Sequence, residues 1–151
     1  MDLPAKPSDQ VTVCWVANLK PLKRPDLLLD LAGQLASRPQ VRFLVIGAQQ
    51  MHGPEWDALL QRLHAAANVD YLGHLAPESV NEQLAKAHLL VNTSDYEGFP
   101  NTFIQAWLRG LPVLSLNVNP DALLDDHCYG HCAAGNLQAL GAALAARVGV
   151  P

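Results

Sequence analysis

Residues 94–102 place a carboxylate, a flexible glycine and a proline directly before a pattern that predicts a helix over 101–109. Asn101 stands where an N-cap residue is expected, since its side chain can accept a hydrogen bond from the first helical turn. The N–H groups of that turn have no partner within the helix, and the helix dipole favours an anion there. The segment therefore suits a phosphate group near Glu97. A capped helix after an ordinary surface turn is the alternative, and spacing alone leaves it open.

Positive charge is concentrated in the loop after the first predicted strand. Lys20, Lys23 and Arg24 are three of the ten lysine and arginine residues, and they lie within five positions. Two phosphates held between this loop and the helix start at Asn101 would account for both features. A solvated basic turn is the alternative for the loop taken alone.

Buried strands alternate with amphipathic helices along most of the chain. The apolar runs predict strands at 11–17, 41–47, 69–72, 88–92 and 112–116. Helical spacing predicts helices at 24–36, from 53 onward through the stripe Trp56, Leu59, Leu60 and Leu63, and at 77–87, 101–109 and 136–148. This alternation is typical of a Rossmann-like α/β domain, in which a parallel sheet has helices on both faces. Ligands of such sheets bind beyond the carboxyl ends of the strands, where the basic loop and Glu97 fall. The strand order stays open.

The composition fits one ordinary domain. Of 151 residues, half are apolar and only 16% are charged, which argues against disorder and against a nucleic-acid partner. The net charge of -4 favours no particular partner. No apolar run approaches the roughly 18 residues of a membrane span. Three cysteines without a secretory signal favour reduced thiols in the cytoplasm. We expect residues 1–10 to be an extension or linker and residues 11–151 to be the domain.

Two further patterns favour a structural role. Residues 127–132 contain two histidines and two cysteines, but their spacing matches neither zinc-finger pairs nor a haem attachment motif. A short strand or turn is expected there, and no metal. Trp15, Trp56 and Trp107 lie on core-facing patterns, which favours packing.

Several motifs in order along the chain resemble the family 4 (group 1) glycosyltransferases. Glu-Gly-Phe-Pro-Asn at 97–101, running through Gly-Leu-Pro-Val at 110–113, resembles the family signature. Residues 16–28 resemble the family's first loop and helix, and residues 72–74 its third-strand exit, so the resemblance covers about 11–148. It implies the GT-B architecture, with an amino-terminal acceptor domain and a carboxy-terminal donor domain. Only the donor domain is matched by this chain, which is expected to be an excised domain.

The resemblance also implies a role for each matching residue. Glu97 would hydrogen-bond hydroxyls of the transferred sugar, and Lys23 would neutralise the diphosphate and stabilise the leaving group. Backbone amides would hold the sugar and the diphosphate at Gly98, Phe99, Pro100, Asn101 and Thr102. Gly73, His74 and Leu75 would contact the base, although a histidine facing solvent or a helix is the commoner case for His74. No metal or other cofactor is then needed.

Two positions depart from the family pattern. The second acid of the signature is replaced by Gln105, which can still hydrogen-bond a ribose hydroxyl but without the strength of a carboxylate. The usual arginine after the first strand is replaced by Asn18, and Lys20 or Arg24 would have to substitute for it. We interpret these changes as marks of a subgroup, because Lys23 and Glu97 remain.

The resulting hypothesis is the donor-binding domain of a retaining, metal-independent glycosyltransferase. It would use a nucleotide-diphosphate sugar and transfer the sugar to a glycan, lipid or protein held by the absent amino-terminal domain. The enzyme is expected in the cytoplasm, at the membrane periphery through that domain. The alternative is a nucleotide-sugar-binding module or inactive paralogue, suggested by Gln105, Asn18 and the missing domain. A nucleotide-sugar 2-epimerase is disfavoured by the 97–101 motif, and a receiver domain by the lack of acids at 18–20.

Overall fold

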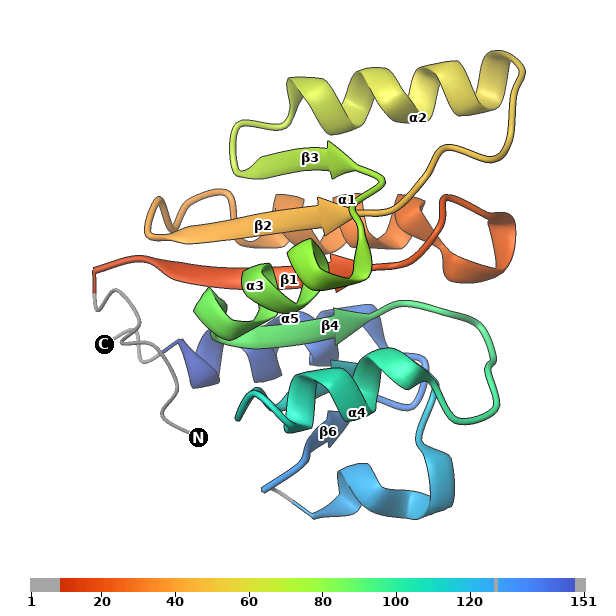
Figure 1. Cartoon of the computed structure of the whole chain (residues 1–151). Coiled ribbons are helices and arrows are strands. Elements are labelled where there is room, and N and C mark those ends of the chain that lie inside the picture. The colour runs from red at the N-terminus through yellow and green to blue at the C-terminus, as the bar shows by residue number, and fades with distance from the viewer. Residues whose placement is uncertain (1–8, 127, 149–151) are drawn as a thin grey trace.

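The computed structural model describes residues 9–126 and 128–148 and contains one six-stranded sheet between two layers of helices (Figure 1). The strands are β1 Val11–Val16, β2 Val41–Ile46, β3 Val69–Gly73, β4 Leu89–Asn92, β5 Val113–Ser115 and β6 Gly130–Cys132. Their order across the sheet is β3-β2-β1-β4-β5-β6, and neighbouring strands are parallel. The predicted fold class is confirmed. Most of residues 1–10, which were expected to form an extension, lie outside the described residues.

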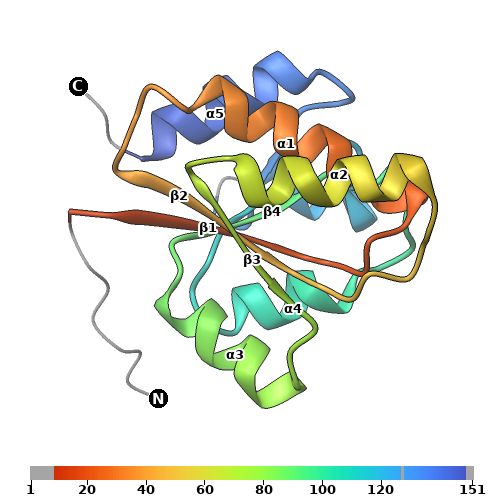
Figure 2. The same cartoon turned by 90° about the horizontal axis from the view of Figure 1, so that it is seen from above.

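Helices cover both faces of the sheet (Figure 2). On one face lie α1 Pro25–Gln34, α2 Pro54–Ala65 and α5 Leu137–Arg147, and on the other lie α3 Pro77–Lys86 and α4 Asn101–Trp107. The helices α1, α2 and α3 each have a proline in the first turn, where its missing N–H costs no helical hydrogen bond. Two 3₁₀ helices, η1 Pro21–Lys23 and η2 Pro120–Asp125, were not predicted.

The side chains of β1 alternate between the two layers. Val13 and Trp15 are buried in the core cluster that includes α1, α2 and α5, whereas Cys14 is buried in the cluster that includes α3 and α4. Burial raises the pKa of the Cys14 thiol to about 12. Cys128 and Cys132 are also free thiols. A strand buried on both faces reads as a continuous apolar run, which is why β1 was recognisable in the sequence.

The order of the strands creates a crevice beside β1. The chain leaves β3 on one side of β1 and passes through α3 to β4, which pairs with β1 on its other side. At such a reversal the loops beyond two adjacent strands diverge, and they leave room for a ligand. The basic loop follows β1 and the Glu97 loop follows β4, so the two candidate loops meet at this reversal.

The helix predicted over 101–109 is shorter, because α4 ends at Trp107. Gly110 has a φ of 74°, and its N–H donates to the carbonyl of Trp107 at 3.0 Å. The N–H of Leu111 donates to the carbonyl of Ala106 at 2.9 Å. These two bonds form a glycine C-cap that ends the helix and turns the chain toward β5.

Candidate functional site

A pocket of about 320 Å³ lies at the carboxyl ends of β1, β2, β3 and β4. Eight of the predicted site residues line it: Lys20, Lys23, His74, Leu75, Glu97, Pro100, Asn101 and Thr102. The other lining residues are Val16, Ala17 and Asn18 after β1, Ile46 and Gly47 at the end of β2, and Val80 of α3. Apart from Asn18, none of these residues was assigned a role from the sequence, although Gly47 begins a segment expected at the ligand edge of the sheet. The signal that could have identified them is their position at or just beyond the carboxyl end of a buried strand, where ligands of such sheets bind.

Five predicted site residues lie outside the lining: Arg24, Gly73, Gly98, Phe99 and Gln105. Arg24 is held by Asp26 at 2.9 Å and by Asp95 at 3.4 Å. Of the two cations proposed to replace the arginine missing at position 18, Lys20 therefore lies in the pocket and Arg24 does not. Phe99 packs edge-on against Trp107, with ring centroids 6.2 Å apart.

An ion pair joins the two residues to which the chemistry was assigned. The Nζ atom of Lys23 lies 2.5 Å from Oε1 of Glu97, and both side chains are largely buried. The amide of Asn92 donates to Oε2 of Glu97 at 2.8 Å. Partial burial acts to raise the pKa of Glu97, but hydrogen bonds from Lys23, Asn92 and Ser94 outweigh it and hold the pKa below its ordinary value. Glu97 is therefore ionised at neutral pH, and its partners hold it in place.

A buried threonine holds the basic loop against β4. The hydroxyl of Thr93 accepts a hydrogen bond from the indole N–H of Trp15 at 2.9 Å. The same hydroxyl donates to two backbone carbonyls, that of Lys23 at 2.8 Å and that of Arg24 at 2.9 Å. The N–H of Asp95 also donates to the carbonyl of Leu22 at 3.0 Å. These contacts bring Lys23 to Glu97 across 74 positions of sequence. Trp15 thus packs in the core, as predicted, and also donates to the loop.

The pocket end of β1 is tied to the end of β2. Oδ1 of Asn18 accepts a hydrogen bond from the N–H of Ala48 at 3.2 Å. The N–H of Leu19 donates to the carbonyl of Ala48 at 2.9 Å. Asn18 therefore supports the pocket wall, and its amide supplies no positive charge there.

The start of α4 differs from the prediction. The N-cap position is occupied by Pro100 and not by Asn101, which is the first helical residue. No side chain caps this helix start. The carbonyl of Pro100 accepts from the N–H of Phe103 at 3.1 Å, but the ψ of Pro100 is 128°, which is extended, so the helix begins at the next residue.

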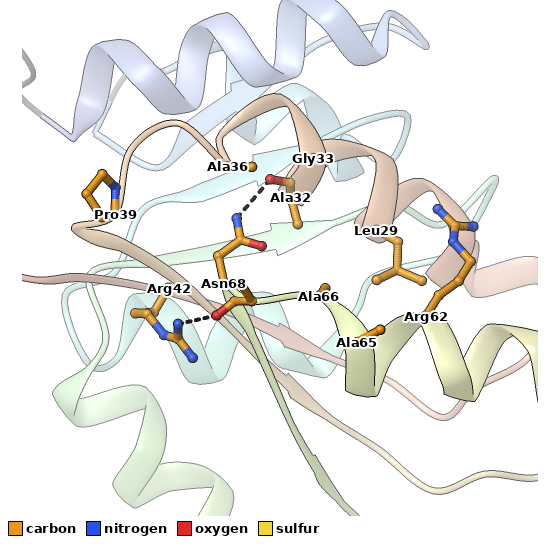
Figure 3. A pocket seen from close by; sticks show the side chains of 11 residues that line it. Leu29, Ala32, Gly33, Ala36, Pro39, Arg42, Arg62, Ala65, Ala66 and Asn68 are labelled. Atoms are coloured by element: carbon orange, nitrogen blue, oxygen red, sulfur yellow. Dashed lines mark hydrogen bonds between the residues drawn. The ribbon is translucent and has the colours of Figure 1, made fainter.

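A second and larger hollow, of about 520 Å³, lies at the opposite edge of the sheet between α1 and α2 (Figure 3). Its wall is formed mainly by alanine, glycine and the start of β2 and β3. Arg42 donates to the carbonyl of Ala67 and pairs with Asp70 at 2.7 Å. Arg62 pairs with Asp30 at 3.1 Å. We place the candidate site in the smaller pocket, because ligands of parallel sheets bind beyond the carboxyl ends of the strands, whereas this hollow lies at the amino ends of β2 and β3.

The segment with two histidines and two cysteines is only partly described. His127 lies outside the described residues, and residues 130–132 form β6, where a strand or turn was expected. In the described part of the chain, no group of three or more His, Cys, Asp or Glu side chains is arranged to hold a metal ion. Within residues 9–126 and 128–148, no helix is long and apolar enough to cross a membrane.

Sequence comparison identifies one family over nearly the whole chain. The family model described as Glycosyl transferases group 1 matches residues 10–148. The D-inositol 3-phosphate glycosyltransferase of Segniliparus rotundus is 32% identical over 130 residues, which are 82% of this chain and 29% of that protein. The protein of the same name from Rhodococcus opacus is 33% identical over 116 residues, 72% of this chain and 26% of its own length. The chain thus spans less than a third of these curated relatives.

Solved structures share the fold over almost all of the chain. A crystal structure of S. aureus TarM, in complex with fondaparinux, alpha-GlcNAc-glycerol and UDP, matches with a TM-score of 0.78 and 21% identity, over 99% of this chain and 31% of TarM. Anabaena HepE in complex with UDP and glucose matches with a TM-score of 0.75 and 23% identity, over 93% of this chain and 39% of HepE. At this level of identity the match establishes the fold alone.

Proposed function

This chain belongs to the group 1 glycosyltransferases, and from that premise we propose that it is the donor-binding domain of a retaining, metal-independent enzyme of that family. Its ligand would be a nucleotide-diphosphate sugar, and the acceptor would be held by an amino-terminal domain that this chain does not include. The observation that carries the proposal is the Lys23–Glu97 ion pair in a pocket at the carboxyl edge of the sheet. It combines a cation for a diphosphate with a carboxylate for sugar hydroxyls.

The ion pair suggests how the two residues act when a donor binds. A diphosphate oxygen can replace Oε1 of Glu97 as the partner of the Lys23 ammonium, and one charge-assisted hydrogen bond is then exchanged for another. The freed Oε1 becomes available to accept hydrogen bonds from sugar hydroxyls. Lys23 then stabilises the charge that develops on the leaving diphosphate. Transfer therefore depends on positioning and on leaving-group stabilisation, with the diphosphate itself able to take the acceptor's proton.

An inactive nucleotide-sugar-binding module is the second candidate. It is favoured by Asn18, whose amide supports the pocket wall where the family arginine is expected, and by Gln105 in place of an acid. Transferase activity of a two-domain protein containing this sequence would decide between the candidates.

The chain should bind a nucleoside diphosphate without transferring sugar. A thermal-shift screen with UDP, GDP and ADP should show one of them raising the melting temperature, because a ligand at 100 times its Kd stabilises a fold by about 2.7 kcal/mol. The matching nucleoside without phosphates is the control, and it should stabilise far less. Mass spectrometry that detected acceptor-dependent transfer by this chain alone would contradict the domain assignment, and the absence of binding by all three diphosphates would contradict the proposed ligand.

Glu97→Gln should separate recognition of the sugar from recognition of the nucleotide. The variant keeps the size of the side chain and one acceptor but removes its charge and releases Lys23 from the ion pair. Affinity for the diphosphate should therefore not fall, whereas affinity for its sugar conjugate should fall about tenfold, since a charge-assisted hydrogen bond is lost. Paired calorimetric titrations measure both. Equal losses for the two ligands would mean that Glu97 supports the loop or the nucleotide instead.

A further inference from the structure

Asn92, the last residue of β4, connects the sheet to Glu97. Its backbone carbonyl accepts from the N–H of Leu116 at 2.9 Å, so pairing with the chain after β5 fixes its position. Its side-chain amide spans the loop that follows: Nδ2 donates to Oε2 of Glu97 at 2.8 Å, and Oδ1 accepts from the N–H of Ser94 at 3.0 Å. Asn92 is only 9% exposed, and it is not among the residues that line the pocket.

Both contacts require a carboxamide at this position. A carboxylate can only accept and a backbone N–H can only donate, so the NH₂ group of Asn92 must face Glu97 and its oxygen must face Ser94. An aspartate would keep the contact with Ser94 but would set two carboxylates against each other. An alanine would lose both contacts and leave a donor unpaired at Ser94, which is 2% exposed.

The two oxygens of Glu97 are held by partners of different kinds. Oε1 is bound by Lys23, which lines the pocket and, under the proposed function, moves to the diphosphate when a donor binds. Oε2 is bound by Asn92, which is buried behind the lining and anchored in the sheet. Ser94 adds a further hydrogen bond. Only the Lys23 contact is thus open to exchange with a ligand.

We propose that Asn92 is a positioning residue for Glu97, which it holds through Oε2 so that Oε1 stays available in the pocket after Lys23 has turned to the diphosphate. The contact between Asn92 and Glu97 stands on geometry alone. Its consequence for sugar binding rests on the proposed function.

The test measures the pKa of Glu97 in the ligand-free chain and then the affinity of the chain for two ligands. The variants are Asn92→Ala and Asn92→Asp, and Asn117→Ala is the control, since Asn117 donates to the carbonyl of Ser94 in the same loop at 3.4 Å. Carbon NMR titration of the ligand-free chain should show the pKa of Glu97 rising in both Asn92 variants and unchanged in the control. Calorimetry uses whichever of UDP, GDP or ADP binds, together with its glucose conjugate. Asn92→Ala should lose about tenfold in affinity for the conjugate and little for the diphosphate.

The two readouts fail separately. An unchanged pKa of Glu97 in Asn92→Ala would overturn the positioning role, whatever the ligands do. A raised pKa with equal changes in affinity for the two ligands would retain that role and overturn the assignment of Glu97 to the sugar. If Asn92→Ala does not fold, the proposal is tested with the double variant Asn92→Asp, Glu97→Gln. This variant exchanges the amide and the carboxylate, so a hydrogen bond between positions 92 and 97 can still form. A thermal double-mutant cycle should show it more stable than Asn92→Asp alone, and a cycle without coupling would overturn the proposal.

Discussion

Gly47→Ala should lower the free energy of unfolding by about 3 kcal/mol or more, at the upper end of what overpacking costs. A Cβ atom at Gly47 would overlap the carbonyl oxygen of Ala17. That carbonyl cannot move away easily, because hydrogen bonds hold the chain on both sides of it. The N–H of Ala17 donates to the carbonyl of Ile46 at 3.0 Å, and the N–H of Leu19 donates to the carbonyl of Ala48 at 2.9 Å. The substitution must therefore separate the exits of β1 and β2, which form one wall of the pocket.

Gly33→Ala is the matched control for Gly47. Gly33 lies within α1, and a Cβ built there has no neighbour within 4 Å. Alanine in a helix is favoured over glycine by about 0.5–1 kcal/mol, so this variant should be slightly more stable than the wild type. Urea unfolding followed by circular dichroism measures both. If the urea midpoint of Gly47→Ala equalled that of the wild type, the chain after β1 would be able to move away from the new Cβ atom without loss of stability.

The sequence alone predicted the strands and helices whose side chains are buried on one or both faces. The bounds predicted for β1, β2, β4, α1, α3 and α5 agree with the structure to within about two residues, because continuous apolar runs and helical stripes report burial directly. β6 was foreseen only as a strand or turn. It has three residues, and its glycine approaches the backbone of Val113 too closely for any side chain. The order of the strands depends on which side of β1 each crossover returns, and no local pattern reports that.

The candidate site was predictable by residue type but not by contact. Motif resemblance selected Lys23 and Glu97, yet only the fold reveals that they pair with each other. Arg24 and Lys20 were equal candidates to replace the arginine missing at position 18, because the sequence shows the charge of each residue but not its partners. The ion pair of Arg24 with Asp26 is local, but its ion pair with Asp95 depends on how the η1 turn and the loop after β4 meet. Asn92 was not considered at all, because an asparagine ending a strand has no signal of its own until its amide is placed between Ser94 and Glu97.

Lys23→Ala should weaken nucleoside diphosphate binding roughly ten- to a hundredfold, and Lys20→Ala much less. A charge-assisted hydrogen bond contributes about 1.5–3 kcal/mol, which corresponds to that range of affinity. Glu97 already orders the ammonium of Lys23, and the hydroxyl of Thr93 holds its backbone carbonyl, so little side-chain freedom is lost when Lys23 binds. Lys20 lines the same pocket but is exposed, and its long side chain must be ordered by the ligand. Calorimetric titration of both variants with the diphosphate selected by the thermal-shift screen measures the difference.

Part of the loss in Lys23→Ala should come from Glu97. Without the lysine, Glu97 keeps Asn92 and Ser94 as partners but loses its counter-charge, so its carboxylate repels the incoming diphosphate. Adding Glu97→Gln to Lys23→Ala should therefore recover some of the affinity, although Glu97→Gln alone is expected to cost none. Affinity in the double variant as low as in Lys23→Ala would show that the carboxylate faces away from the phosphates. Equal losses in Lys23→Ala and Lys20→Ala would show instead that the loop acts as a diffuse basic surface, with no lysine assigned to the diphosphate.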